Sequence, residues 1–142
     1  MRRLFTMLSI SALFLALVCP AAMAQEEIQN WSLGIGDQWG GIGGHYVSIE
    51  EGSTTGLAFG IGLGGASLGV PFLIGEGGNG LELSYTYGFW KYEDEALHGV
   101  TLAYGNFPVE KGDFVWRVGT GYWHIEDDWD WLPISLGFGF VL

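Results

Sequence analysis

The sequence has a single cysteine, Cys19, and only five basic side chains among its 142 residues. Cys19 lies within an N-terminal segment that we expect to be removed, so the rest of the chain can form no disulfide and has no thiolate chemistry. Lipidation of Cys19 is not expected, because a lipoprotein signal has a small residue before the cysteine and this chain has Val18 there.

A long apolar run is also missing after the N-terminus. Two arginines at the start precede an apolar stretch over residues 4–18, and Ala22-Met23-Ala24 follows it. This order is typical of a secretory signal peptide. The stretch is shorter than the roughly 20 residues that a membrane-spanning helix needs. We therefore predict a cleaved signal peptide over residues 1–24 and a single exported domain over residues 25–142.

Positive charge is scarce in the predicted exported domain. It has 16 acidic residues but only three basic ones, Lys91, Lys111 and Arg117, so its net charge is −13. Such a surface repels nucleic acid, because binding begins with neutralisation of the phosphates. Divalent cations and basic partners remain compatible with it.

Apolar residues and glycine are abundant instead. Hydrophobic residues make up 49% of the chain and aromatic residues 15%, and there are 25 glycines. With no long run to hold this apolar content, the remaining arrangement is an apolar residue at every second position. Leu57, Phe59, Ile61 and Leu63 alternate with small residues in this way, which predicts a β-strand.

The same alternation predicts six strands after residue 54. We expect them at residues 55–64, 67–72, 81–90, 100–105, 114–122 and 134–142, with acidic loops at 91–95 and 124–131. Two weaker β-like segments, 31–35 and 46–49, flank an expected loop at 37–44 and bring the count to eight. We favour eight because an even barrel places both termini on one side, and because six strands would leave too little room for side chains.

The two faces of these strands differ in side-chain size. One face is large and apolar, while the other carries mostly Gly, Ala, Ser and Thr. The small face suits the inside of a narrow tube and the large face suits lipid, with aromatic side chains near the strand ends as interfacial girdles. Closure of the sheet would leave no unpaired backbone in hydrocarbon. The sequence thus predicts an all-β, antiparallel, up-and-down transmembrane β-barrel.

The chain resembles the small outer-membrane β-barrel superfamily that includes the OmpA transmembrane domain, OmpX-like proteins and opacity-type proteins. The resemblance rests on the signal peptide, the alternating strands and the C-terminal pattern Leu136-x-Phe138-x-Phe140-x-Leu142. It implies a location in the bacterial outer membrane, contact with lipopolysaccharide and insertion by the outer-membrane assembly machinery. It implies no particular activity and no cofactor.

Two charged residues are expected inside the barrel. Alternation places Arg117 and Glu82 on the small face, two strands apart. We predict a lumen ion pair, because a lone buried charge is costly and a paired one is tolerable. The alternative is that each of the two side chains meets water or a backbone carbonyl.

Candidate oxygen ligands for a metal lie in the second acidic segment. Glu126, Asp127, Asp128 and Asp130 are of the type that Ca²⁺ or Mg²⁺ prefers, although their spacing matches no EF-hand loop. We favour a solvated loop, bridged by divalent cations to lipopolysaccharide phosphates, over a dedicated metal site.

Three histidines are the candidates for acid–base chemistry near neutral pH, namely His45, His98 and His124. No His-x-Ser pair accompanies them, so a catalytic role is not favoured, although distant residues can converge. Three functions stay open: a structural or surface-interacting outer-membrane barrel too narrow for a general solute pore, a lipid A-modifying barrel enzyme, and an exported lipocalin-like binder of an apolar ligand. We favour the first.

Overall fold

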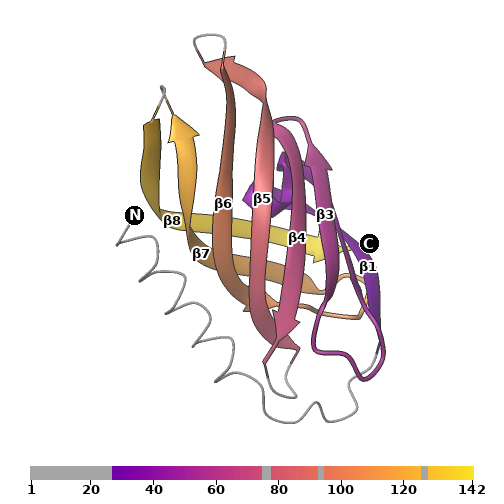
Figure 1. Cartoon of the computed structure of the whole chain (residues 1–142). Coiled ribbons are helices and arrows are strands. Elements are labelled where there is room, and N and C mark those ends of the chain that lie inside the picture. The colour runs from indigo at the N-terminus through magenta and orange to yellow at the C-terminus, as the bar shows by residue number, and fades with distance from the viewer. Residues whose placement is uncertain (1–26, 75–77, 93–94, 126–127) are drawn as a thin grey trace, which may run out of the picture.

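The computed structural model describes residues 27–74, 78–92, 95–125 and 128–142, and these form a closed, eight-stranded antiparallel barrel (Figure 1). The strands are β1 (Ile28–Gly36), β2 (Gly41–Ile49), β3 (Gly56–Gly62), β4 (Gly65–Leu73), β5 (Asn79–Tyr92), β6 (Glu95–Asn106), β7 (Phe114–Ile125) and β8 (Asp128–Val141). The predicted all-β barrel of eight antiparallel strands is confirmed. The predicted signal peptide lies outside the described residues.

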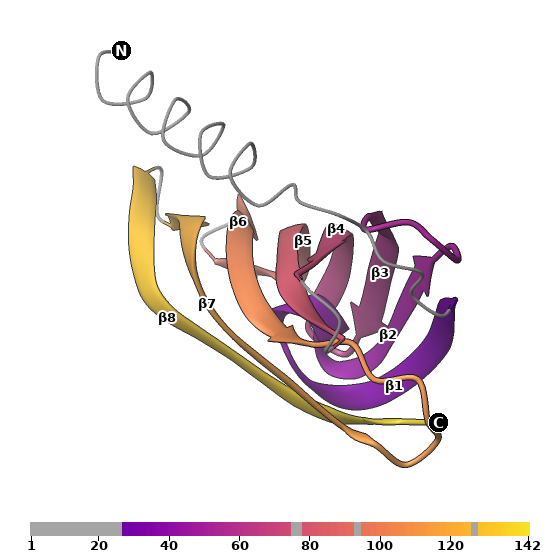
Figure 2. The same ribbon diagram turned by 90° about the horizontal axis from the view of Figure 1, so that it is seen from below.

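Each strand pairs with its neighbour in sequence, and β8 returns to β1. The closing seam pairs Ser32–Ile35 with Phe138–Val141, and the amide of Leu142 donates to the carbonyl of Trp31 at 2.9 Å. The end of the chain therefore lies beside β1 (Figure 2). No helix in the described part of the chain is long and apolar enough to cross a membrane.

Side chains alternate between the two faces of the barrel wall as predicted. Those on the inner face are buried and include Ser32, Ser84, Thr86 and Thr101. The outer face is apolar and exposed on every strand. It includes Leu33, Ile35, Ile42, Leu57, Phe59, Ile61, Leu68, Val70, Leu83, Tyr85, Val100, Leu102, Tyr104, Phe114, Val118, Leu136, Phe138 and Phe140. The large face of the strands is thus the outer face.

The prediction for residues 37–44 is corrected by the structure. A short 3₁₀ turn, η1 (Asp37–Trp39), replaces the expected loop, and β2 already begins at Gly41. Gly41–Gly44 pairs directly with Leu33–Gly36. The glycines hid this part of the strand from a pattern search, because alternation is visible only where apolar side chains mark one face.

The two predicted acidic loops are also wrong in extent. The β5 strand runs to Tyr92 and β6 starts at Glu95, while β7 and β8 pair as far as Ile125 with Asp128. Both segments are therefore mostly strand. Acidic residues there interrupt the apolar pattern without preventing backbone pairing, which depends on the peptide groups and not on side-chain charge.

The hairpins formed by β5–β6 and β7–β8 extend past the other strands. Gly65 at the start of β4 pairs with Gly88, yet β5 continues for four more residues to Tyr92. Figure 1 shows the β5–β6 hairpin projecting beyond the β3–β4 turn. We call this end of the barrel the hairpin end.

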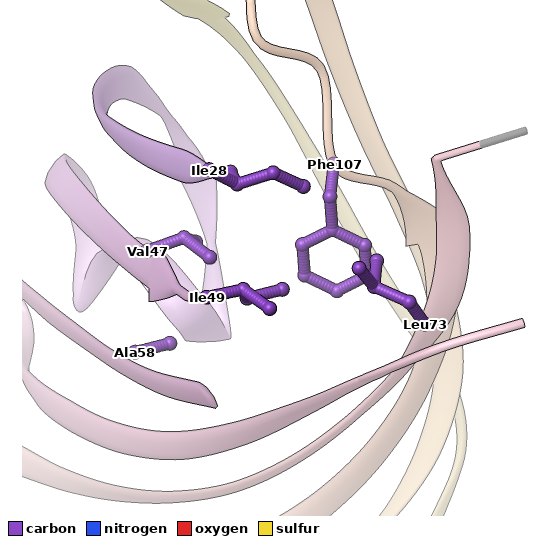
Figure 3. Packing of buried hydrophobic residues seen from close by; sticks show 6 residues of the cluster. All are labelled: Ile28, Val47, Ile49, Ala58, Leu73 and Phe107. Atoms are coloured by element: carbon purple, nitrogen blue, oxygen red, sulfur yellow. The ribbon is translucent and has the colours of Figure 1, made fainter. Parts of the chain in front are cut away.

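A small hydrophobic cluster closes the opposite end. It consists of Ile28, Val47, Ile49, Ala58, Leu73 and Phe107, all buried. Figure 3 shows the ring of Phe107, from the β6–β7 connection, lying among Ile28, Ile49 and Leu73. Burial of these side chains removes apolar surface from water, which stabilises the folded chain by about 25 cal/mol for each Å² buried.

Candidate functional site in the barrel interior

Three ionisable side chains meet inside the barrel, and each is positioned by the alternation of its own strand. His45 comes from β2, Glu82 from β5 and Arg117 from β7. Their exposed fractions are 1%, 1% and 2%. They share the inner face with buried Val47, Ser84 and Val115, two residues away in each strand. Strand parity alone therefore directs all three side chains inward.

Glu82 is the centre of this group. Its Oε1 lies 3.2 Å from Nε2 of His45, and its Oε2 lies 3.5 Å from Nε of Arg117. The carboxylate thus bridges β2 and β7 from its position on β5. The opposite charges of Glu82 and Arg117 compensate one another where water is excluded, which is the condition under which a buried charge is tolerated.

The rest of the Arg117 side chain is also held. Its Nη1 donates to the carbonyl oxygens of Asn106 and Trp116, the latter at 3.1 Å. The guanidinium carbon lies 4.0 Å from the centre of the Phe107 ring, a cation–π contact. Arg117 therefore links the charged group to the hydrophobic cluster that closes one end of the barrel.

On the side of this group nearer the hairpin end, η1 folds into the barrel and fills it. Trp39 has no exposed surface, and its Nε1 donates to Ser32 Oγ at 3.1 Å. Ser67 Oγ donates to the carbonyl of Gln38 at 2.6 Å, and the ring of Trp39 lies 5.4 Å from that of His45. We refer to Asp37–Trp39 as the plug.

Glycines on the surrounding strands make room for the plug. A methyl group on Gly60 would lie 1.7 Å from the carbonyl oxygen of Gln38, and one on Gly137 would lie 2.5 Å from the indole of Trp39. No side chain can occupy these positions while the plug stays in place. The small residues of the inner face therefore fit around the plug and do not line an empty tube.

The structure brings together Glu82 and Arg117, the two residues of the predicted lumen pair, and adds His45 to them. The sequence prediction missed His45 because the expected strand began at residue 46. A signal was present, since His45, Val47 and Ile49 continue one alternation. His98 and His124 lie elsewhere, as register partners on β6 and β7 with rings 5.1 Å apart.

The acidic residues considered as metal ligands are only partly described. Glu126 and Asp127 fall outside the described residues, while Asp128 and Asp130 belong to β8. Within the described ranges, no three His, Cys, Asp or Glu side chains come close enough to hold a metal ion.

Ser32 lies beside His45 and Glu82, so a serine, a histidine and a carboxylate occur together in the interior. They are not arranged for nucleophilic attack. Ser32 is the register partner of His45, yet its Oγ donates to the backbone carbonyl of His45 at 3.3 Å. Ser32 is only 3% exposed, so a substrate has no access to it in this conformation. The contacts fit a group that packs and rigidifies the barrel.

The chain forms a closed eight-stranded antiparallel β-barrel. Its interior is filled by side chains, and at the centre the Glu82 carboxylate contacts both His45 and Arg117. Comparison of the chain with protein-family models, with curated proteins and with solved structures gives no match.

Proposed function

We propose that this protein is a small outer-membrane β-barrel with a structural or surface-interacting role, and that its interior is too full to serve as a general solute pore. The observation that carries the proposal is the continuous outer band of exposed apolar side chains. On the outer face of the strands, Leu57 is 66% exposed, Leu68 64% and Ile134 62%. A protein surrounded by water would rarely expose so large an apolar surface.

The height of the apolar band supports a membrane environment. The exposed outer residues at this edge run from Ile134 on β8 to Leu142, one residue past the end of that strand. A stretch of about 9 residues, at ~3.3 Å per residue and tilted by about 40°, spans roughly 20 Å. An outer-membrane barrel has an apolar band about 25 Å tall. Towards the hairpin end from Ile134, β8 carries the exposed acidic residue Asp130, so the apolar band ends between these two residues.

The filled interior supports a role other than transport. Trp39 and Gln38 have no exposed surface, and the cluster around Phe107 occupies the opposite end. In this proposal the hairpin end faces the medium and contacts lipopolysaccharide, with divalent cations bridging acidic side chains to phosphate. The outer-membrane assembly machinery is the partner that inserts the barrel.

The lipocalin-like alternative requires the reverse arrangement of the two faces. A binder of apolar ligands keeps its large apolar side chains inside, whereas here they lie on the outer face. The lipid A-modifying alternative requires an accessible histidine and nucleophile. The buried positions of Ser32 and His45 do not favour it.

Migration in detergent gels tests the proposal. We expect the folded protein to migrate differently before and after boiling, because membrane barrels resist unfolding by detergent at room temperature. The expected shift disappears when the protein is denatured in urea beforehand. A protein that stays soluble and monomeric without any detergent would contradict the proposal.

A further inference from the structure

A pair of histidines lies on the outer face of the barrel, apart from the interior group around Glu82. His98 on β6 and His124 on β7 are direct register partners, and their ring centres are 5.1 Å apart with the ring planes inclined by 41°. Both side chains point outward, because Val100 and Tyr122, two residues away along each strand, are exposed on the outer face. Residues directly opposite in an antiparallel pair have neighbouring side chains, so the two imidazoles form one group.

The backbone holds both histidines in position. His98 is also the register partner of Tyr87 on β5, and His124 is that of Trp129 on β8. Each histidine therefore belongs to a strand that is paired on both sides. The ring of Tyr85 packs near His98, with the ring centres 5.9 Å apart. A ligand that binds both imidazoles thus meets groups that are already held close together, which reduces the entropy lost on binding.

The histidine pair lies just past the apolar band, on the side of the hairpin end. Asp130, which lies beyond the end of that band, pairs with Trp123, and His124 is one residue further towards the hairpin end. Both histidines are partly exposed. An ion in the medium therefore reaches them without crossing the apolar band. The net charge of −13 on the predicted exported domain raises the local concentration of cations at this surface.

The separation of the two rings fits two ligands of one metal ion. Imidazole nitrogens bind a tetrahedral ion such as Zn²⁺ at about 2.0–2.1 Å, which places the two ring centres roughly 5 Å apart. The observed separation is 5.1 Å. Nδ1 of both rings is buried, which leaves Nε2 as the ligand atom. Because imidazole has two nitrogens, one can bind a metal ion while the other makes a hydrogen bond.

We propose that His98 and His124 together bind one divalent transition-metal ion through their Nε2 atoms, with water in the remaining coordination positions. Imidazole suits Cu²⁺, Ni²⁺ and Zn²⁺, whereas Mg²⁺ and Ca²⁺ prefer carboxylate and carbonyl oxygens. Cu²⁺ binds most tightly of the three, as it does at nitrogen ligands in general. The alternative is that the two rings only pack against each other. The proposal does not depend on the membrane location.

Calorimetry of the folded protein in detergent micelles, without a histidine tag, tests the proposal with Zn²⁺ and Cu²⁺ as probes. An excess of Mg²⁺ is present to occupy the many carboxylates of this acidic chain. We expect saturable binding of one Zn²⁺ per chain and tighter binding of Cu²⁺ at the same stoichiometry. Absence of saturable binding of both ions under these conditions would overturn the proposal.

Single and double substitutions separate a shared site from two independent histidines. We expect His98→Ala and His124→Ala each to weaken Zn²⁺ affinity at least tenfold, because either change leaves a single imidazole. The double variant should add little to either loss. Circular dichroism verifies that each variant is folded. Unchanged Zn²⁺ affinity in either folded single variant would overturn the proposal.

A relocated histidine is the matched control. Val109 is exposed in the β6–β7 connection, at the opposite end of the barrel. Val109→His in the His98→Ala chain restores the number of histidines but not the pair, and we expect no recovery of Zn²⁺ affinity. Full recovery would show that binding depends on the number of histidines and not on their arrangement, which would overturn the proposal.

Electron paramagnetic resonance of the Cu²⁺-loaded protein identifies the ligand atoms without any substitution, so it does not depend on the folding of a variant. Two imidazole nitrogens split the copper signal in a pattern that differs from that of one nitrogen or of oxygen ligands. We expect the two-nitrogen pattern in the unsubstituted protein and the one-nitrogen pattern in His98→Ala. A spectrum with oxygen ligands only, or with one nitrogen, in the unsubstituted protein would overturn the proposal.

Discussion

Single charges in the barrel interior matter because Glu82 and Arg117 lie where water is excluded. Removing one partner of a buried pair leaves the other charge uncompensated, which costs about 3–5 kcal/mol. His45 contacts only one oxygen of Glu82, at 3.2 Å, so it does not replace Arg117 at the other oxygen. The stability of the interior thus depends on both partners being present.

Arg117→Leu is therefore expected to destabilise the folded protein by about 3–5 kcal/mol. Arg117→Lys keeps a positive charge near Glu82 and should cost clearly less. Urea unfolding in detergent micelles measures both, and Lys111→Leu serves as the control because Lys111 is exposed. If Arg117→Leu is no more destabilising than Arg117→Lys, the ion pair does not stabilise the barrel.

The face of the sheet that Glu82 and Arg117 occupy was predictable, because each residue lies within a long, clearly alternating strand. Period-two alternation fixes which face a side chain occupies, although it does not give its height in the barrel. His45 was missed for a related reason. It lies at the glycine-rich start of a strand whose pattern becomes visible only one residue later.

At the level of elements, the plug is the feature that alternation cannot reveal. Asp37–Trp39 is a three-residue turn, and its inward fold depends on contacts with strands distant in the sequence. Its place is set by Gly60 and Gly137, whose missing side chains were apparent in the sequence only as a small face. What they accommodate depends on tertiary structure.

Gly60→Ala tests this complementarity. The added methyl group would lie 1.7 Å from the Gln38 carbonyl oxygen, so the plug must move, and we expect a loss of about 1–3 kcal/mol or more. Gly44→Ala is the matched control on β2, where the nearest atom, in the Trp31 ring, is 3.3 Å away. We expect that control to stay within about 0.5 kcal/mol of the parent in urea unfolding. Equal effects of the two substitutions would mean that the plug does not require Gly60.

The pairing of β8 with β7 shows a second limit of sequence patterns. Gly119 pairs with Ser135 but Gly121 pairs with Leu132, so Pro133 and Ile134 lie opposite Thr120. Proline cannot donate a hydrogen bond to a ladder and is typical of such irregular positions. This bulge shifts the register between the two parts of the β7–β8 pair, and a sequence pattern does not show such a shift.

For the whole molecule, the number of strands, their order and the facing of the two surfaces followed from alternation, glycine content and the absence of long apolar runs. These properties are set by local periodicity and by the need to close a sheet. The environment of the barrel is not set in this way. It is inferred from the exposed outer band, which includes Leu57, Phe59 and Ile134.

Flotation with lipid vesicles tests the membrane assignment most directly. The purified protein is mixed in detergent with phospholipid, the detergent is removed, and the sample is placed under a density gradient. We predict that the protein floats with the vesicles and stays with them after a urea wash, because its apolar outer band lies in the bilayer. Folded protein that remains in the dense fraction as a soluble monomer would contradict the account.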